Sequence, residues 1–341
     1  MARLLTEGFE MQDLVGYSSP ISNMSFIDTV LSTSEKHSGT SSVALGYYST
    51  FGIPFASSSE IYFRMWVYFT SSFRMRMYWR NYATTLGYIE FDWDGRIRVY
   101  AGDPIAYAKI GTNILSFGNW YLLEMYIKIA DSGTITVKID GVEDSTWSGD
   151  TKPGTDTTIN NVAFFTGGWL GIPFPPLTYI DDVAINDTTG GVDDSWCGDG
   201  RIIGTLPAGT AFQQLNGSDG NATDNHLLVN EIPTDSDTTY VKGIVADEED
   251  LYTLTACGLT GVTINRVWTE ARAKDSAGAG GKVALITKAA GGSEVSGGDV
   301  YILNSYTKKI LGAEQLLNPV DSEAWTPEDI DDVQIGPRTR I

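Results

Sequence analysis

The chain has 341 residues, of which 42% are hydrophobic and 11% aromatic, so it can bury sizeable cores and its length favours two domains over one. It carries 23 Lys and Arg residues against 43 Asp and Glu residues, a formal net charge of −20. This charge excludes binding to nucleic acid or to an anionic membrane through a broad basic surface. We therefore expect no nucleic-acid partner and no membrane partner.

The first ten residues lack the apolar core of a secretory signal, and no later run is long enough to span a bilayer. We expect a protein that is made in the cytoplasm and exported, if at all, by lysis or by a dedicated route.

Helical periodicity is almost absent from the first 190 residues. Apolar residues alternate with polar ones in short runs, and Gly, Asp, Asn, Ser and Thr separate the runs. This pattern is typical of antiparallel sheets stacked as sandwiches, so the sequence predicts an all-β fold. The predicted strands of domain 1–190 are 42–48, 60–69, 73–79, 86–91, 96–101, 120–129, 133–139, 142–147, 161–166 and 179–185.

The strand pattern lapses in residues 191–237, which are rich in turn residues. We interpret this segment as a linker or long loop with a short strand at 201–205. Strands resume in 238–341, where we expect a second, smaller β-sandwich. Its predicted strands are 239–245, 250–256, 262–273, 282–288 and 300–306, and a one-turn helix follows at 326–330, with Thr326 as N-cap and Pro327 at the first helical position.

In the hairpin around residues 86–101, the alternation of apolar and charged residues predicts the register of the two strands. A two-residue loop would mix charged and apolar groups on both faces, whereas a three-residue loop, Trp93-Asp94-Gly95 with Gly95 left-handed, separates them. The three-residue loop pairs Phe91 with Ile97 and Ile89 with Val99 on the core side, and Asp92 with Arg96 and Glu90 with Arg98 on the other side.

Four segments resemble successive strands of the concanavalin A-like lectin/glucanase (laminin-G-like) superfamily, and the resemblance covers about the first 190 residues. The segments are 60–69, 120–126, 134–141 and 179–183. This resemblance implies a jelly-roll sandwich for domain 1–190.

The remainder of the chain is similar to two-domain structural proteins of tailed bacteriophages. That similarity rests on the order of the motifs at 199–202, 206–207, 237–241, 250–252 and 324–326. It implies a virion component on a capsid or tail surface, with no catalytic residues to carry over.

An enzyme hypothesis starts from Glu90-Phe91-Asp92-Trp93-Asp94, which resembles the Glu-x-Asp-x-Glu strand of jelly-roll endoglucanases. A retaining glycosidase holds its two carboxyl groups ~5–5.5 Å apart, while strand residues four apart are ~13 Å apart along the backbone. Asp94 is one methylene shorter than Glu and precedes Gly95, so the motif favours a turn.

Other residue types that often carry chemistry are few. Cys197 and Cys257 are the only cysteines, and we expect both to be free thiols without a function. His37 and His226 are the only histidines, and both lie in polar stretches that are typical of surface loops. We therefore expect no catalytic residue and no cofactor, and we predict that the chain is not an enzyme.

Asp181 and Asp182 form a candidate calcium pair together with a neighbouring carbonyl group. Adjacent strand residues point to opposite faces, so the two carboxylates are poorly placed to share one ion. We predict no metal site.

Two surfaces are candidate binding sites. Alternation along residues 73–80 places Arg74, Arg76, Tyr78 and Arg80 on one face, which suits a glycan or an acidic partner. The alternative is that these arginines pair with acids on adjacent strands. The loop 169–177 is apolar and stiffened by prolines, and it suits either a partner contact or packing under its own domain. Its candidate contact residues are Trp169, Leu170, Ile172 and Phe174.

We expect a non-enzymatic phage virion protein, a capsid decoration or tail-associated component that is assembled in the host cytoplasm. Its expected partners are other virion proteins and further copies of itself. The alternative hypothesis is a carbohydrate-binding module of a tail protein that binds a host-surface glycan, and the third is a jelly-roll glycoside hydrolase.

Overall fold

The structure of the chain is a computed structural model, and it describes residues 3–14, 29–46, 49–71, 75–167, 177–278, 280–306 and 309–340. The chain divides into two compact units. The first unit comprises Met1–Glu10 and Tyr17–Ile203, and the second comprises Met11–Gly16 and Gly204–Ile341.

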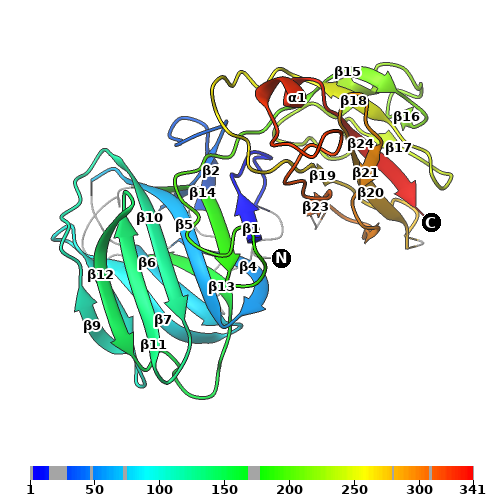
Figure 1. Cartoon of the computed structure of the whole chain (residues 1–341). Coiled ribbons are helices and arrows are strands. Elements are labelled where there is room, and N and C mark those ends of the chain that lie inside the picture. The colour runs from blue at the N-terminus through cyan, green and yellow to red at the C-terminus, as the bar shows by residue number, and fades with distance from the viewer. Residues whose placement is uncertain are drawn as a thin grey trace. The chain divides into compact units, whose positions relative to one another are not determined.

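The first unit contains two antiparallel sheets, built from the described residues, that we call sheet A and sheet B (Figure 1). Sheet A has eight strands in the order β12-β11-β10-β5-β14-β3-β2, with β1 also paired to β14. They are β1 (Arg3–Glu7), β2 (Thr29–Ser32), β3 (Ser42–Leu45), β5 (Glu60–Phe69), β10 (Trp120–Lys128), β11 (Gly133–Ile139), β12 (Val142–Gly149) and β14 (Thr178–Asp187).

Sheet B has six strands in the order β4-β13-β6-β7-β8-β9 within the same described ranges. They are β4 (Thr50–Ser58), β6 (Met75–Asn81), β7 (Thr84–Phe91), β8 (Ile97–Ala101), β9 (Ala106–Ile110) and β13 (Ile159–Thr166).

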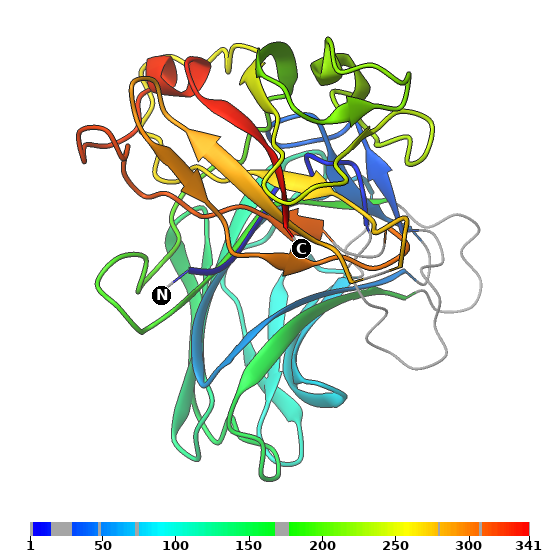
Figure 2. The same cartoon turned by 90° about the vertical axis from the view of Figure 1, so that its right-hand side faces the viewer.

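The two sheets of the first unit lie face to face as the layers of a sandwich (Figure 2). Aromatic rings meet between the layers: the ring centroids of Phe63 and Phe164 are 6.4 Å apart, and those of Phe69 and Phe91 are 4.9 Å apart. All four side chains are buried. Burial of each such side chain stabilises the fold by ~1.5–3 kcal/mol. The predicted all-β fold class and the jelly-roll type of sandwich are confirmed.

Strand β4 was not predicted from the sequence. Its Gly52 and Pro54 disfavour a strand, because Gly has no side chain to pack and Pro lacks an N–H for the sheet. Both are tolerated because β4 is the first strand in the order of sheet B and pairs there with β13. Local pattern therefore fails at this edge, whereas β5 and β11 have the predicted bounds.

The hairpin between β7 and β8 has the predicted register. Phe91 is opposite Ile97 and Glu90 is opposite Arg98. The N–H of Asp92 donates to the carbonyl oxygen of Arg96 at 3.0 Å, which closes the three-residue loop. Gly95 has a φ of 76°, in the left-handed region that favours glycine.

This loop gives a first testable prediction. Replacing Gly95 with valine places a β-branched side chain at a positive φ, so we expect the free energy of unfolding of the first unit to fall by about 2 kcal/mol. Urea unfolding of the Gly95→Val variant and of the wild type measures the difference. An unchanged unfolding midpoint would contradict the proposed role of Gly95.

In the second unit, the described strands form sheet C, in the order β15-β18-β24-β20-β21 with β22 also paired to β20, and two small sheets, β16–β17 and β19–β23. The strands are β15 (Pro207–Phe212), β16 (Asn216–Gly217), β17 (Val241–Lys242), β18 (Leu251–Leu254), β19 (Glu270–Arg272), β20 (Lys282–Lys288), β21 (Glu294–Ser296), β22 (Val300–Tyr301), β23 (Lys309–Leu311) and β24 (Gln334–Arg340).

The core of the second unit joins sheet C to the small sheet β19–β23. Val283 and Leu285 of β20 form a buried cluster with Ile310 of β23, so two layers pack together as a smaller sandwich. The predicted helix is present as α1 (Pro327–Asp331), and Thr326 and Asp329 cap it reciprocally. The described residues also include a 3-10 turn, η1 (Asn225–Leu228). Within the described residues, no helix is long and apolar enough to cross a membrane.

The segment 191–237, interpreted above as a linker or long loop, contributes more structure than its composition indicated. Its part before residue 204 belongs to the first unit and the rest to the second. The short strand expected at 201–205 is absent there, and β15 follows instead and pairs with β18. Strand β24 was not predicted, because Gly336 and Pro337 interrupt its pattern.

Candidate functional site

A row of tyrosines crosses the outer face of sheet B. Tyr78, Tyr88, Tyr100 and Tyr107 occupy opposed positions on β6, β7, β8 and β9. Their ring centroids are separated in turn by 5.1, 4.4 and 5.9 Å, and the central pair is stacked with an interplanar angle of 12°. The rings therefore stand side by side on the sheet. We call these four residues the tyrosine row.

An ion pair lies beside the tyrosine row. Arg76 Nη2 is 2.7 Å from Glu90 Oε1, and the Arg76 guanidinium carbon is 5.4 Å from the centroid of the Tyr88 ring. Burial lowers the pKa of Arg76, but its hydrogen bonds to Tyr78 and Glu90 raise that pKa overall. The Arg76 side chain is 41% exposed. The face thus offers a fixed cationic donor and a fixed anionic acceptor next to aromatic rings.

The phenol groups of Tyr88 and Tyr100, at the centre of the row, are held in their protonated form. Burial raises the pKa of Tyr100 to about 12, and the charge of Glu90 and a hydrogen bond to it act in the same direction. Burial also raises the pKa of Tyr88. At neutral pH these hydroxyl groups are therefore available to donate and to accept hydrogen bonds.

The charge pairs predicted for the β7–β8 hairpin are different in the structure. Glu90 pairs with Arg76 of β6, and Arg98 binds Asp92 at 2.5 Å and Asp94 at 2.9 Å. Arg96 donates to backbone carbonyl groups. The backbone register was predicted correctly, but long arginine side chains reach beyond the residue directly opposite.

These pairs bear on the glycosidase hypothesis for Glu90 and Asp94. The hydrogen bond from Arg98 lowers the pKa of Asp94, so this carboxylate stays ionised at neutral pH. Glu90 is bound by Arg76. Each carboxylate has its own arginine partner, and the geometry does not support a catalytic pair at these two residues.

The candidate surface from the sequence coincides in part with the tyrosine row. Tyr78 belongs to the row and Arg76 lies beside it, whereas Arg80 is 8% exposed and donates to the carbonyl oxygen of Ala83. Arg74 lies outside the described residues.

Tyr88, Tyr100 and Tyr107 were not predicted as site residues. The alternation in 86–91 and 96–101 was sufficient to place Tyr88 on the face of Glu90 and Tyr100 on the face of Arg98. Tyr107 lies on β9, a strand that was not predicted.

The loop predicted as a partner contact, with Trp169, Leu170, Ile172 and Phe174, lies outside the described residues. Its role stays a prediction.

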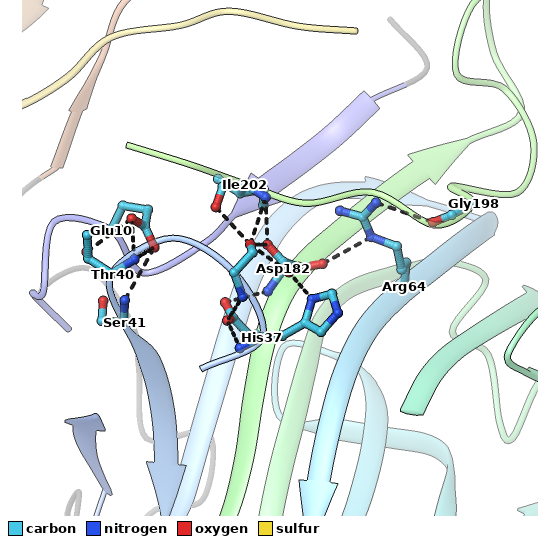
Figure 3. A network of polar contacts seen from close by, with 10 residues as sticks. Glu10, His37, Thr40, Ser41, Arg64, Asp182, Gly198 and Ile202 are labelled. Atoms are coloured by element: carbon cyan, nitrogen blue, oxygen red, sulfur yellow. Dashed lines mark hydrogen bonds and ion pairs between the residues drawn. The ribbon is translucent and has the colours of Figure 1, made fainter. Parts of the chain in front are cut away.

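A second polar cluster lies on sheet A, where β14 has a bulge between Asp181 and Ala184 (Figure 3). Asp182 has a φ of 50°, and the bulge breaks the alternation that we assumed for the two acids. Asp181 Oδ2 accepts the N–H groups of His37 and Ser38, and Asp182 Oδ2 is 2.7 Å from Nδ1 of His37. The prediction that the two carboxylates point to opposite faces is therefore wrong.

The same cluster joins three separate segments. Asp182 Oδ1 accepts the hydroxyl of Ser38 at 2.7 Å and the N–H of Ile202 at 2.6 Å. Arg64 Nε donates to the carbonyl oxygen of Asp182, and its Nη1 donates to that of Gly198 (Figure 3). These bonds hold the segments 37–38 and 198–202 on β14 and β5.

His37 is not the surface residue that its polar neighbours indicated. Its ring stacks on Trp66 at 3.7 Å with an interplanar angle of 13°, and only 9% of its side chain is exposed. Burial and the neighbouring Asp182 raise the pKa of Asp181 to about 8. The oxygens of both carboxylates already accept hydrogen bonds. In the part of the chain that the structure describes, no group of three or more His, Cys, Asp or Glu residues is arranged to hold a metal ion.

Among the described residues, the remaining histidine and the two cysteines do not belong to any group of three or more His, Cys, Asp or Glu residues that could hold a metal ion. Nδ1 of His226 is 3.1 Å from the hydroxyl of Thr210. Cys197 and Cys257 are free thiols, as predicted. Burial raises the pKa of Cys197 to about 11, so this thiol is unreactive at neutral pH.

The two outer faces of the sandwich differ in how exposed their polar and aromatic side chains are. On sheet A, Arg64, Glu124 and Asp181 are each at most 4% exposed. On sheet B, the tyrosine row is partly exposed, and Tyr107 is 54% exposed. Tyr62 and Tyr126 on sheet A are also partly exposed, so what distinguishes sheet B is its row of four opposed tyrosines.

No protein-family model matches the chain, and no curated protein matches it either. Solved structures match at low identity. An endo-β-1,4-glucuronan lyase from the fungus Trichoderma reesei is 12% identical, with a TM-score of 0.43, over 57% of this chain and 100% of the lyase. The cellulose-induced protein Cip1 is 15% identical, with a TM-score of 0.41, over 57% of this chain and 100% of Cip1.

A third similar structure is a mutant of the alginate lyase Aly36B in complex with an alginate tetrasaccharide. It is 15% identical, with a TM-score of 0.39, over 53% of this chain and 95% of the lyase. Two of these three structures are enzymes, and this finding contradicts the prediction that the chain is not an enzyme. At this level of similarity, the comparisons identify neither a substrate nor a site for this chain.

Proposed function

We propose that the chain binds carbohydrate on the outer face of sheet B. The observation that supports this proposal is the tyrosine row, with the Arg76–Glu90 pair beside it. Sugar rings combine apolar C–H faces with many hydroxyl groups, so they suit a surface of aromatic rings flanked by fixed donors and acceptors. A sugar chain laid across β6 to β9 contacts several tyrosines at once.

The charges on this face favour a neutral sugar over an acidic one. Arg76 is neutralised by Glu90, and Arg98 is held by the two acids of the β7–β8 hairpin. Binding a sugar carboxylate through either arginine would break an existing ion pair. Sugar hydroxyl groups can instead form hydrogen bonds with the paired side chains while the ion pairs stay intact.

A glycan array that contains neutral and uronate-containing glycans tests the proposal on the full chain. We expect binding to neutral glycans and a loss of at least about 10-fold in affinity in Tyr88→Ala and Tyr100→Ala, because each variant removes a ring from the centre of the row. Isothermal titration with the best neutral glycan of the array measures the loss.

The matched control is Tyr126→Ala. Tyr126 forms a similar tyrosine pair with Tyr62, at 4.8 Å, but on sheet A. We expect this variant to bind as the wild type does. Equal losses in the control and in the row variants would place the site elsewhere, and no binding of any glycan by the wild type would exclude the proposed function.

Assembly into a phage particle, with other virion proteins and further copies of the chain, stays a prediction from the sequence. Detection of the protein by mass spectrometry in purified particles tests this prediction.

A further inference from the structure

A shallow pocket lies at the β4–β13 side of sheet B, with a volume of about 440 Å³. This volume falls within the ~300–1,000 Å³ that is common for small-molecule sites. The pocket lies where the regular pairing of β4 and β13 is interrupted between Ile159 and Asn161, since the single residue Asn160 there faces residues 55–57 of β4. It is lined by Pro54, Phe55, Ala56, Ser57, Tyr82, Asn160 and Asn161.

The pocket continues the face that carries the tyrosine row. Asn161 is directly opposite Arg80, and Ala163 is directly opposite Tyr78. Asn161 therefore lies two residues along β13 from the line of the row, a distance of ~6.6 Å along a strand. A sugar chain on the row needs only a short extension to enter the pocket.

Asn161 presents an acceptor that lacks a partner. Its side chain is 7% exposed, and its Oδ1 atom is buried without a hydrogen-bond partner in the structure. A buried polar atom of this kind is costly unless something binds it. The neighbouring Asn160 is already engaged, because its Oδ1 accepts the N–H of Tyr82.

Tyr82 is the exposed wall of the pocket. Its side chain is 79% exposed, although it lies in the turn between β6 and β7 that Asn160 holds in place. Its φ of 47° is unfavourable for an aromatic residue, and a glycine at this position would relieve the strain. A strained, exposed tyrosine next to an unpartnered acceptor points to a ligand.

We propose that this pocket is a terminal sugar subsite, in which one neutral sugar residue packs against Tyr82 and donates a hydroxyl hydrogen bond to Oδ1 of Asn161. This inference rests on the proposed function of the tyrosine row. The inference adds that the pocket binds the end or a branch of the sugar chain, while the tyrosine row binds the rest of that chain.

Isothermal titration of the full chain with neutral β-1,4-linked gluco- and manno-oligosaccharides of two to six units tests the subsite. For the wild type, we expect affinity to rise with chain length until the sugar reaches the pocket. Tyr82→Gly and Asn161→Ala remove this last rise and lower the affinity for the six-unit chain by roughly 3- to 10-fold. They leave the binding of two-unit chains unchanged.

The matched control is Trp93→Gly, which removes another exposed aromatic side chain, 76% exposed, from the hairpin at the opposite end of β7. We expect it to bind the six-unit chain as the wild type does. If Tyr82→Gly and Asn161→Ala bind the six-unit chain with wild-type affinity while Tyr88→Ala does not, the subsite is excluded and the tyrosine row stands. If the wild type binds none of these probes and no glycan of the array, both proposals fail.

Discussion

Replacing Asp182 with alanine is expected to lower the free energy of unfolding of the first unit by about 3–5 kcal/mol. The carboxylate is fully buried and accepts from the N–H of Ile202 and from the hydroxyl of Ser38, and it contacts the ring of His37. Alanine removes the carboxylate from the contact with Nδ1 of His37 at 2.7 Å, and it leaves Ser38 and Ile202 only the hydrogen bonds that they make with each other. The φ of 50° adds a further cost, because alanine disfavours the left-handed region more than aspartate does.

Urea unfolding followed by tryptophan fluorescence measures this effect, since Trp66 and Trp120 lie against His37. Asp182→Asn is the matched control. Asparagine tolerates the same backbone conformation and keeps an acceptor oxygen, so we expect a smaller loss of stability. A loss below about 1 kcal/mol in Asp182→Ala would show that the cluster in Figure 3 does not hold the segments 37–38 and 198–202 in place.

The β7–β8 hairpin and the cluster of Asp181 and Asp182 differ in how far the sequence could predict them. The β7–β8 hairpin is local, and its alternation of charged and apolar residues admits one clean register, which the structure has. The cluster of Asp181 and Asp182 depends on a bulge and on residues 37–38 and 202, which are distant in the sequence. No local pattern indicates which distant segment satisfies a buried carboxylate.

The candidate site was predicted only in part for a related reason. Alternation within one strand identified Arg76 and Tyr78 as neighbours on a face. Identifying the tyrosine row also needs the order of strands in sheet B, because Tyr88, Tyr100 and Tyr107 come from three further strands. The prediction that the chain is not an enzyme rested on the absence of a histidine-based pair and of a suitable carboxylate pair, and those are not the only residues with which a β-sandwich can carry out catalysis.

Gly87→Ala is expected to lower the free energy of unfolding of the first unit by about 3 kcal/mol. Gly87 on β7 is directly opposite Trp79 on β6. A Cβ atom at Gly87 would lie 2.3 Å from Cζ2 and 2.6 Å from Cε2 of the Trp79 indole, far inside contact distance. Trp79 is fully buried between the sheets, so its ring has no free space into which to move.

The Gly87→Ala variant also tests whether the tyrosine row depends on the packing of the core beneath it. If the two strands separate to admit the methyl group, the Tyr78–Tyr88 contact at 5.1 Å opens, and glycan affinity falls together with stability. The matched control is Gly191→Ala, because a Cβ at Gly191 meets no atom within 4 Å, so that variant should unfold and bind as the wild type does. Urea unfolding of both variants measures the change in stability, and glycan titration of both measures the change in affinity. Wild-type stability in Gly87→Ala would mean that β6 and β7 accommodate the methyl group, and that the tyrosine row does not depend on the close approach of Trp79 to Gly87.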